Sequence, residues 1–246
     1  MLRTTTLGIK DVQRAAEEVH HAAGRSTTME ECAREIVRFL YEQTTDEAGQ
    51  RASALVRCFK TQSFAELPSD LQAVVTERDS VTAATKCLTL LATAGDEPAW
   101  NSRQQSAAHK VIPLPSPRIA ARSPMIAQLI HQFGLDINDV VNPRPEVLLN
   151  LHERAYNVFY VNNALDSPHI PAQQQFVVPY GIKSVIGFGG LLASGDLFAI
   201  IMFLKVEIPK EKAELFQLLA ISVKTAFTHY AWGDPFAPGS VLATQG

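Results

Sequence analysis

The glycine cluster Gly187–Gly190 (GFGG) is the first candidate for a chemical site, because glycine-rich loops can cradle phosphates. A dinucleotide-binding fingerprint needs G-x-G-x-x-G/A between a strand and a helix whose N-terminal amides hold the pyrophosphate. Here Leu192 occupies the sixth position, and the residues that follow predict a strand and not a helix. The sequence also lacks a Walker A loop. We therefore interpret these glycines as structural, allowing either a bulge or a close approach of a helix or ligand to a strand.

Metal binding and nucleophilic catalysis have no better support. His152 and Glu153 begin an H-E-x-x-H motif, but Tyr156 stands where the second histidine is required. The sequence has no G-x-S-x-G elbow for a serine nucleophile. Its three cysteines form no CxxC pair, so they predict neither a disulfide framework nor a zinc site. We therefore predict no catalytic residue, no metal site and no enzymatic activity.

Aromatic and polar residues indicate a different kind of site. Aromatic residues gather in the last third of the chain, and several polar residues stand in a long segment without helical or strand periodicity. Small-molecule sites are typically aromatic pockets with a few convergent polar groups. The candidate ligand-binding residues are Arg103, His109, Tyr160, Phe176 and Tyr180. The same aromatics would serve equally well in a core and the loop residues on a surface, so both interpretations stay open.

These residues must be positioned by helices, which the apolar spacing predicts in five segments. The predicted helices span residues 9–22, 29–40, 67–79, 123–134 and 210–230. Gly24 is expected to end the first helix, and Thr27 or Thr28 can form a capping box with a glutamate three residues later. Ser123 is the expected N-cap of the fourth helix, and Gly134 its stop signal.

Strand-forming residues predict a sheet. The predicted strands span residues 52–61, 87–95, 156–161, 184–192 and 197–205. Alternation places Ala54, Val56 and Cys58 on one face of the first strand, and Gly195 suits the turn between the last two. Residues 96–122 contain four prolines and are predicted to form an ordered loop. Terminal helices grouped against one antiparallel sheet predict an α+β fold.

The composition bounds the class of protein. A chain of 246 residues with 46% hydrophobic and 19% charged residues suits one domain, which we place at 9–230 between a tail at 1–8 and a flexible tail at 231–246. A formal net charge of −3 offers no basic footprint for nucleic acid. The N-terminus lacks a signal-peptide apolar region, and the longest apolar run, 197–204, is too short to span a bilayer. We therefore expect a cytoplasmic protein.

Three segments together resemble a bacterial GAF-like sensory module. They are PAWNSR at 98–103, IPLPS at 112–116 and FVVPYGIKSVIGFGG at 176–190, in this order. The resemblance covers nearly the whole chain, from residue 10 to residue 230. Modules of this kind commonly precede PAS, histidine-kinase or phosphatase output domains. The resemblance implies a GAF/PAS-like central antiparallel sheet, with N- and C-terminal helices packed on one side and a pocket under the long connections.

The resemblance also implies how a signal would be transmitted. In such modules the first and last helices often pack against those of a second copy, and this parallel homodimer passes strain to an output domain. The matching segments here are 9–22 and 210–230, and the segment after Tyr230 is too short for an output domain. A kinase or phosphatase output domain, in cis or in trans, is the expected partner in two-component signalling. Neither the cysteine–histidine motif of bilin-binding photoreceptors nor the NKFDE signature of cyclic-nucleotide binding is present.

Two hypotheses about function follow. The first is a signal-sensing domain that binds a small molecule or a haem-like cofactor and changes dimer geometry; His109 and His169 would be the axial ligands of a haem. The second is a protein-interaction or dimerisation module without a ligand, in which the aromatics are core and the terminal helices are the working surface. The identity of the ligand or cofactor is left open.

Overall fold

The computed structural model describes residues 1–75, 81–107, 109–143, 157–231 and 233–236. Its centre is a six-stranded antiparallel sheet with the strand order β5-β4-β3-β8-β7-β6. The strands are β3 (Ser53–Ser63), β4 (Lys86–Gly95), β5 (Val111–Leu114), β6 (Val158–Val161), β7 (Ser184–Leu191) and β8 (Leu197–Leu204). Two short strands, β1 (Leu2–Arg3) and β2 (Thr44–Thr45), form a separate parallel pair.

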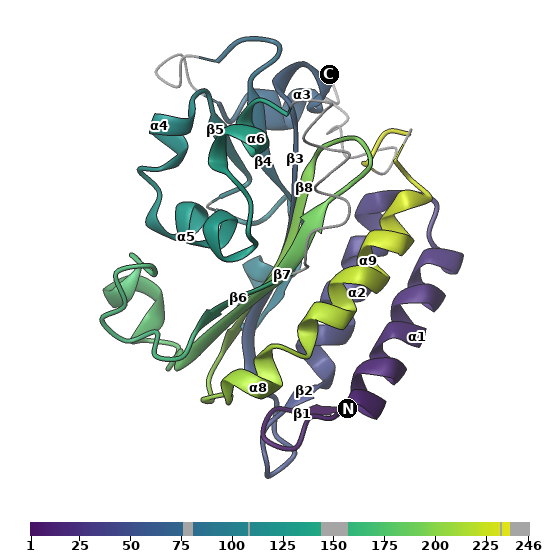
Figure 1. Ribbon diagram of the computed structural model, residues 1–246, viewed down its shortest axis with the longest axis vertical. Coiled ribbons are helices and arrows are strands. Elements are labelled where there is room, and N and C mark those ends of the chain that lie inside the picture. Colours follow the sequence, from purple (N-terminus) through teal and green to yellow (C-terminus); the bar gives the residue numbers. More distant parts are fainter. Residues whose placement is uncertain (76–80, 108, 144–156, 232, 237–246) are drawn as a thin grey trace.

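The long helices cover one face of this sheet (Figure 1). They are α1 (Ile9–Arg25), α2 (Met29–Gln43) and α9 (Phe216–Thr228), the last preceded by the short α8 (Lys210–Ala213). Their apolar stripes pack on side chains that alternate along each strand toward this face, such as Ile186 and Phe188 of β7. The N- and C-terminal helices therefore share one side of the sheet, and the predicted α+β arrangement is confirmed.

Short elements cover the opposite face and the sheet edges (Figure 1). On that face lie α4 (Pro117–Ala120), α5 (Pro124–Gln132), α6 (Ile137–Val141) and the single π-helical turn η4 (Gln173–Val177). The connections contain α3 (Ser69–Gln72) and the 3₁₀ turns η1 (Phe64–Glu66) and η3 (Pro98–Asn101). A second apolar cluster fills this side of the sheet, so the core is divided into two halves by β3, β8 and β7.

The first two helices begin and end as local chemistry dictates. The side chain of Thr28 caps α2 by accepting a hydrogen bond from the amide of Glu31, and the Glu31 carboxylate accepts one from the amide of Thr27. The first helix continues one residue past Gly24, to Arg25, because the Ser26 hydroxyl donates to the carbonyl of Ala22 and closes the last turn there. Thr28 is the N-cap, one of the two predicted candidates, and the Glu31 carboxylate bonds the amide of Thr27 where a capping box would bond that of the N-cap residue. Gly24 does not end the first helix.

The prediction that 96–122 is a loop without regular structure is wrong. This segment contains η3, β5 and α4. Pro98 and Pro117 occupy the first residues of η3 and α4, where the missing amide hydrogen is not needed. Pro113 is tolerated in β5 because that strand lies at the edge of the sheet and pairs on one side only.

Other expectations need correction in their boundaries. The helix expected over 210–230 is interrupted at Glu214 and Leu215. Of the helix expected over 67–79, one turn is present as α3, and residues 76–79 lie outside the described residues. Ala54 belongs to the same half of the core as Leu55 and not to that of Val56, because β3 changes register against β8 between Ser53 and Leu55. The sequence patterns do not predict α6 and η4.

Some expectations concern residues at the edges of the described chain. The predicted strand at 156–161 is present as β6, although Tyr156, with the rest of 144–156, lies outside the described residues. In the two segments assigned as tails, Leu2, Leu7 and Phe236 are buried, and 237–246 lies outside the described residues. No helix in the described part of the chain is both long enough and apolar enough to cross a membrane.

Two glycines of β7 allow close packing on the sheet. An ideal Cβ at Gly187 would lie 3.1 Å from the Cβ of Phe159, its partner on β6. One at Gly189 would lie 2.1 Å from the carbonyl oxygen of Phe198 and 3.0 Å from the ring of Phe133. The pairing of β7 with β8 shows no register shift, so the glycines mark a close approach and not a bulge. Gly195 takes a φ of 82° in the turn that follows, as expected.

Candidate functional site

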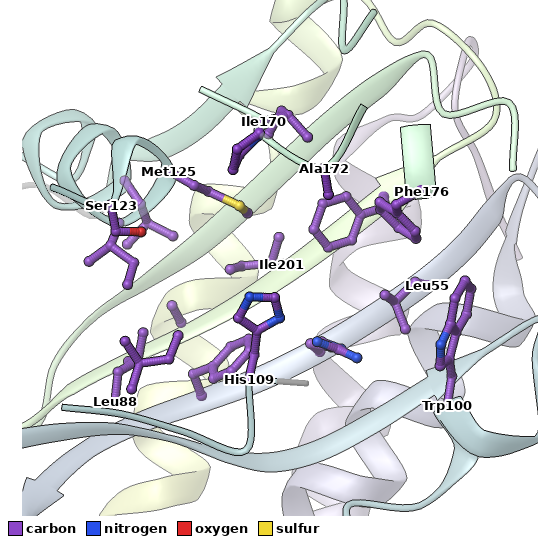
Figure 2. Close-up of a pocket in the computed structure, with 18 of the residues that line it drawn as sticks. Leu55, Leu88, Trp100, His109, Ser123, Met125, Ile170, Ala172, Phe176 and Ile201 are labelled. Carbon is purple, nitrogen blue, oxygen red and sulfur yellow. The ribbon is translucent and has the colours of Figure 1, made fainter. Parts of the chain in front are cut away.

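A cavity of about 330 Å³ lies on the side of the sheet opposite the terminal helices. Its floor consists of side chains from β3, β4 and β8, and its walls come from α5, η4 and the segment between β4 and β5. Figure 2 shows Met125 and Ser123 on one side of this space and Trp100 and Phe176 on the other. Most of the lining is apolar: Leu55, Phe59, Leu88, Ile112, Ile126, Leu129, Ile170, Leu197, Ile201 and Phe203.

Aromatic rings close one end of the cavity. The ring of Phe176 stands perpendicular to that of Phe203, with centroids 4.9 Å apart, and lies 5.6 Å from Trp100. Tyr180 packs on Trp100 with a centroid separation of 4.6 Å, and its hydroxyl donates to the Glu97 carboxylate at 3.1 Å. These contacts join η4 to η3, which are 72 residues or more apart in the sequence, so two distant segments form one wall.

Polar groups reach the cavity from four parts of the chain. Arg57 of β3 lines it from the floor, and its Nη2 donates to the hydroxyl of Ser106 at 3.2 Å. His109 projects from the loop toward the middle of the space (Figure 2). Ser123 stands at the N-cap position of α5, but its hydroxyl caps no amide of that helix. Gln175 completes the polar part of the lining.

The local environment changes the protonation of two of these groups. Burial lowers the pKa of Arg57 to about 10, so its guanidinium is still charged at neutral pH. Burial of the His109 ring lowers its pKa, and the nearby charge of Arg57 lowers it further. His109 also has a φ of 61°, a left-handed conformation that is uncommon outside glycine and is often found at functional sites. At neutral pH the cavity therefore holds one cation and one neutral imidazole.

No model of a protein family and no curated protein matches the sequence. Among solved structures, the chain is similar to free methionine-R-sulfoxide reductase from Neisseria meningitidis in complex with its substrate, at 11% identity and a TM-score of 0.50. The match covers 94% of this chain and 96% of that chain. With the sheet order and the helix layer described above, this similarity decides the fold. The chain has a GAF-like fold.

Structures that are named as GAF domains are also similar to the chain. One is the GAF domain of a phosphoenolpyruvate-protein phosphotransferase from Coxiella burnetii, at 11% identity over 90% of this chain and 95% of that chain, with a TM-score of 0.43. Another is a phycocyanobilin-bound GAF domain from a cyanobacterial phytochrome, at 9% identity over 92% and 97%, with a TM-score of 0.43. At such identities the similarity concerns the fold alone.

The GAF-like fold brings three of the five predicted site residues to the cavity. His109 and Phe176 line it, and Tyr180 packs behind Phe176 in the aromatic wall. Tyr160 lies elsewhere: its hydroxyl donates to the carbonyl of Ile208 at 2.6 Å, and it borders a separate hollow beside α8. Tyr160 therefore does not share a site with the other aromatics.

Arg103 also points away from the cavity. Its Nε donates to Glu30 of α2 at 2.9 Å, and its Nη1 lies 3.4 Å from the Asp70 carboxylate. Its guanidinium stacks over the ring of Phe236 at 5.0 Å. Arg103 thus ties the cavity loop to the helix layer.

The fold does not bring the two histidines proposed as haem ligands together in one cavity. His109 lines the cavity, whereas His169 is not among the lining residues. The backbone amide of His169 lies in a turn and donates a hydrogen bond to the Ser167 hydroxyl. Within the described part of the chain, no group of three histidine, cysteine or acidic side chains is placed to hold a metal ion. The residues present therefore do not fit a haem held by these two histidines.

Arg57 lines the cavity but is not among the residues that the sequence predicts for the site. Alternation in β3 places Val56 and Cys58 on one face and Arg57 on the other, a pattern that by itself predicts a solvated arginine. Arg57 is buried only because other elements cover that face of the sheet. Met125 and Ser123, at the start of α5, were also missed as site residues, since their pattern is that of an ordinary helix N-terminus. Local patterns do not reveal which helix will stand over the sheet.

Proposed function

We propose that this protein is a non-enzymatic signal-sensing domain of bacterial signal transduction. It binds a small molecule in the cavity between the sheet and α5, and it transmits the bound state through its terminal helices and the geometry of a homodimer. The output is a kinase or phosphatase domain, in cis or in trans, in a cytoplasmic two-component system.

The observation that carries this proposal is the cavity itself. A volume of about 330 Å³ with a largely apolar lining and a few polar groups is typical of small-molecule sites. An empty space of this size in a core would cost stability, because its lining atoms lose packing partners. A ligand with an apolar body would restore those contacts.

The segment between η3 and β5 offers a route from the ligand to the helices. Trp100 of η3 and His109 of this segment line the cavity, and Arg103 between them pairs with Glu30 of α2 and stacks on Phe236. A ligand that prefers one position of this segment would shift the equilibrium between positions of the attached elements by its difference in affinity.

The thiols support a binding role over catalysis. The similar reductase acts on a sulfoxide, and such chemistry needs a reducing group at the site. None of the residues that line this cavity is a cysteine, and Cys32, Cys58 and Cys87 are all buried elsewhere. Burial raises the pKa of Cys32 to about 12 and also raises that of Cys58, so neither is a ready thiolate at neutral pH.

Binding can be measured through Trp100, since its ring is part of the cavity wall. In a Trp232→Phe background, we expect at least one compound of a metabolite panel to change the Trp100 emission and to raise the melting temperature of the protein. Filling the cavity by Ala199→Phe should abolish both responses. If no compound in a broad panel produces either response, the sensing proposal is contradicted.

A ligand-free dimerisation module is the second candidate, and the surface of α9 favours it. Leu218 and Ile221 are 42% and 44% exposed and are three residues apart, so they share one face of the helix. We expect Leu218→Glu with Ile221→Glu to convert a dimer to a monomer in sedimentation velocity without loss of helical content. Val178→Glu, at an equally exposed apolar residue next to η4, is the matched control. A dimer that survives the double substitution would exclude this surface.

A further inference from the structure

The cavity contains a positive charge, Arg57, that no described residue of its lining balances. We propose that the ligand is an organic acid, with an apolar body that fills the cavity and a carboxylate that pairs with Arg57. This inference rests on the proposed function, since it names the chemical class of the ligand that the cavity binds.

The contacts of Arg57 leave its guanidinium with donors to spare. The residue is 8% exposed, and Nη2 has the Ser106 hydroxyl as its partner, while the buried Nε has none among the described residues. None of the described residues that line the cavity is acidic, and Arg57 forms no ion pair with any described residue. A guanidinium presents its donors in a planar fork that matches the two oxygens of a carboxylate.

Other cations buried to a similar degree show what is missing at Arg57. Lys60 lies 2.9 Å from the Asp196 carboxylate, and Arg103 lies 2.9 Å from that of Glu30. A buried charge without a partner is strongly unfavourable, so proteins normally pair such groups. At Arg57 the anion has to come from outside the described chain, and the cavity gives a small molecule the space to supply it.

Further polar groups surround the expected position of the carboxylate. Thr93 is the partner of Arg57 on β4, so both side chains emerge on one face of the sheet. Its hydroxyl is buried and has no partner among the described residues. The neutral ring of His109 projects into the same space and carries one N–H donor (Figure 2). The apolar lining from Leu129, Ile126 and Met125 lies on the α5 side, where the body of the ligand would pack.

A matched pair of probes tests this class of ligand. Decanoate and 1-decanol have the same chain length and differ in the charge of the head group, and each can be titrated against the bound fluorescent probe N-phenyl-1-naphthylamine. We expect decanoate to displace N-phenyl-1-naphthylamine at a concentration at least about tenfold lower than decanol does, since hydrogen bonds to a charged group discriminate by this much or more.

Substitutions at Arg57 then assign the preference to one residue. Arg57→Met removes the charge but keeps much of the side-chain length. It should reduce the ratio of the displacing concentrations of decanol and decanoate to about one, with a melting temperature no lower than that of the parent. Arg57→Lys should retain part of the preference, because it keeps the charge without the fork. Arg118→Met, at an exposed arginine of α4, is the control and should leave the ratio unchanged.

The outcomes separate this inference from the proposed function. If N-phenyl-1-naphthylamine binds to the parent protein and decanoate and decanol displace it equally well, the organic-acid class is overturned and a small-molecule site still stands. A preference for decanoate that persists in Arg57→Met would overturn the role of Arg57. If decanoate, decanol and N-phenyl-1-naphthylamine all fail to bind while a compound of the metabolite panel does, the organic-acid inference is overturned and the small-molecule site stands. If the panel gives no response either, the proposed function fails, and this inference fails with it.

Discussion

Replacement of Gly189 by alanine is expected to destabilise the protein by about 3 kcal/mol or more. The added Cβ would lie 2.1 Å from the carbonyl oxygen of Phe198 and 2.9 Å from the Cα of Ala199. Both atoms belong to the backbone of β8, the neighbouring strand, so they cannot move aside as a flexible side chain would. The sheet would have to separate locally, and the ring of Phe133 above it would be displaced as well.

The midpoint of urea denaturation, with an unchanged slope, measures this loss. The same substitution at Gly24 is the matched control, because no atom lies within 4 Å of a Cβ there and the residue is helical. Alanine at Gly24 should stabilise the protein by roughly 0.5 kcal/mol. If Gly189→Ala is as stable as the parent protein, the close approach of β7 to β8 is not what requires glycine.

Replacement of Asp196 by asparagine is expected to cost about 3 to 5 kcal/mol of stability at neutral pH. This carboxylate lies in the turn between β7 and β8, and its two oxygens contact Lys60 at 2.9 Å and Lys86 at 2.7 Å. The side chains of all three residues are largely buried. Asparagine would leave two buried ammonium groups side by side without a counter-charge, so the loss exceeds that of a surface ion pair.

The pH dependence of this loss has a definite sign. Burial alone would raise the pKa of Asp196, but the charges of Lys60 and Lys86 outweigh it and hold the pKa below its ordinary value. A carboxylate with a lowered pKa contributes stability above its unfolded pKa, about 4, and this contribution disappears as pH falls through the folded pKa. The difference between the parent and Asp196→Asn should therefore be constant from pH 7 to 5 and shrink below pH 4.

Thermal or urea denaturation at several pH values tests both statements. Glu42→Gln is a suitable control, because Glu42 pairs with Arg38 on the exposed surface of α2 at 3.7 Å. That change should alter stability by less than about 1 kcal/mol at any pH. An Asp196→Asn variant whose stability matches the Glu42→Gln variant at pH 7 would contradict the importance of the buried lysine–aspartate cluster.

Local patterns accounted for much of the framework of the fold. The helix at Ile9 and the strands at Ser184 and Leu197 were found because apolar residues recur at the helical or strand period, which needs no knowledge of the partner. The capping role of Thr28 and the positive φ of Gly195 are also local properties of a few residues. The resemblance of the motifs then predicted the GAF-like arrangement that the structure shows.

Partner-dependent features could not be predicted in this way. Pro113 was expected to break a strand, and only the position of β5 at the sheet edge makes it acceptable. Ala54 lies on the opposite face of the sheet from the one that alternation predicts, because the pairing of β3 with β8 is irregular there. These two strands are far apart in the sequence.

For the site, the sequence by itself predicted a pocket with Arg103, His109, Tyr160, Phe176 and Tyr180, since aromatic clusters and polar loop residues are visible in one dimension. The tertiary structure brings His109, Phe176 and Tyr180 to the cavity and places Tyr160 and Arg103 elsewhere. Only the tertiary structure decided that Arg103 forms an ion pair with Glu30, and that Arg57 faces the cavity without a counter-charge among the described residues. The physical reason is that burial and charge pairing are set by neighbours that are distant in the sequence, and a residue's own type and spacing do not specify them.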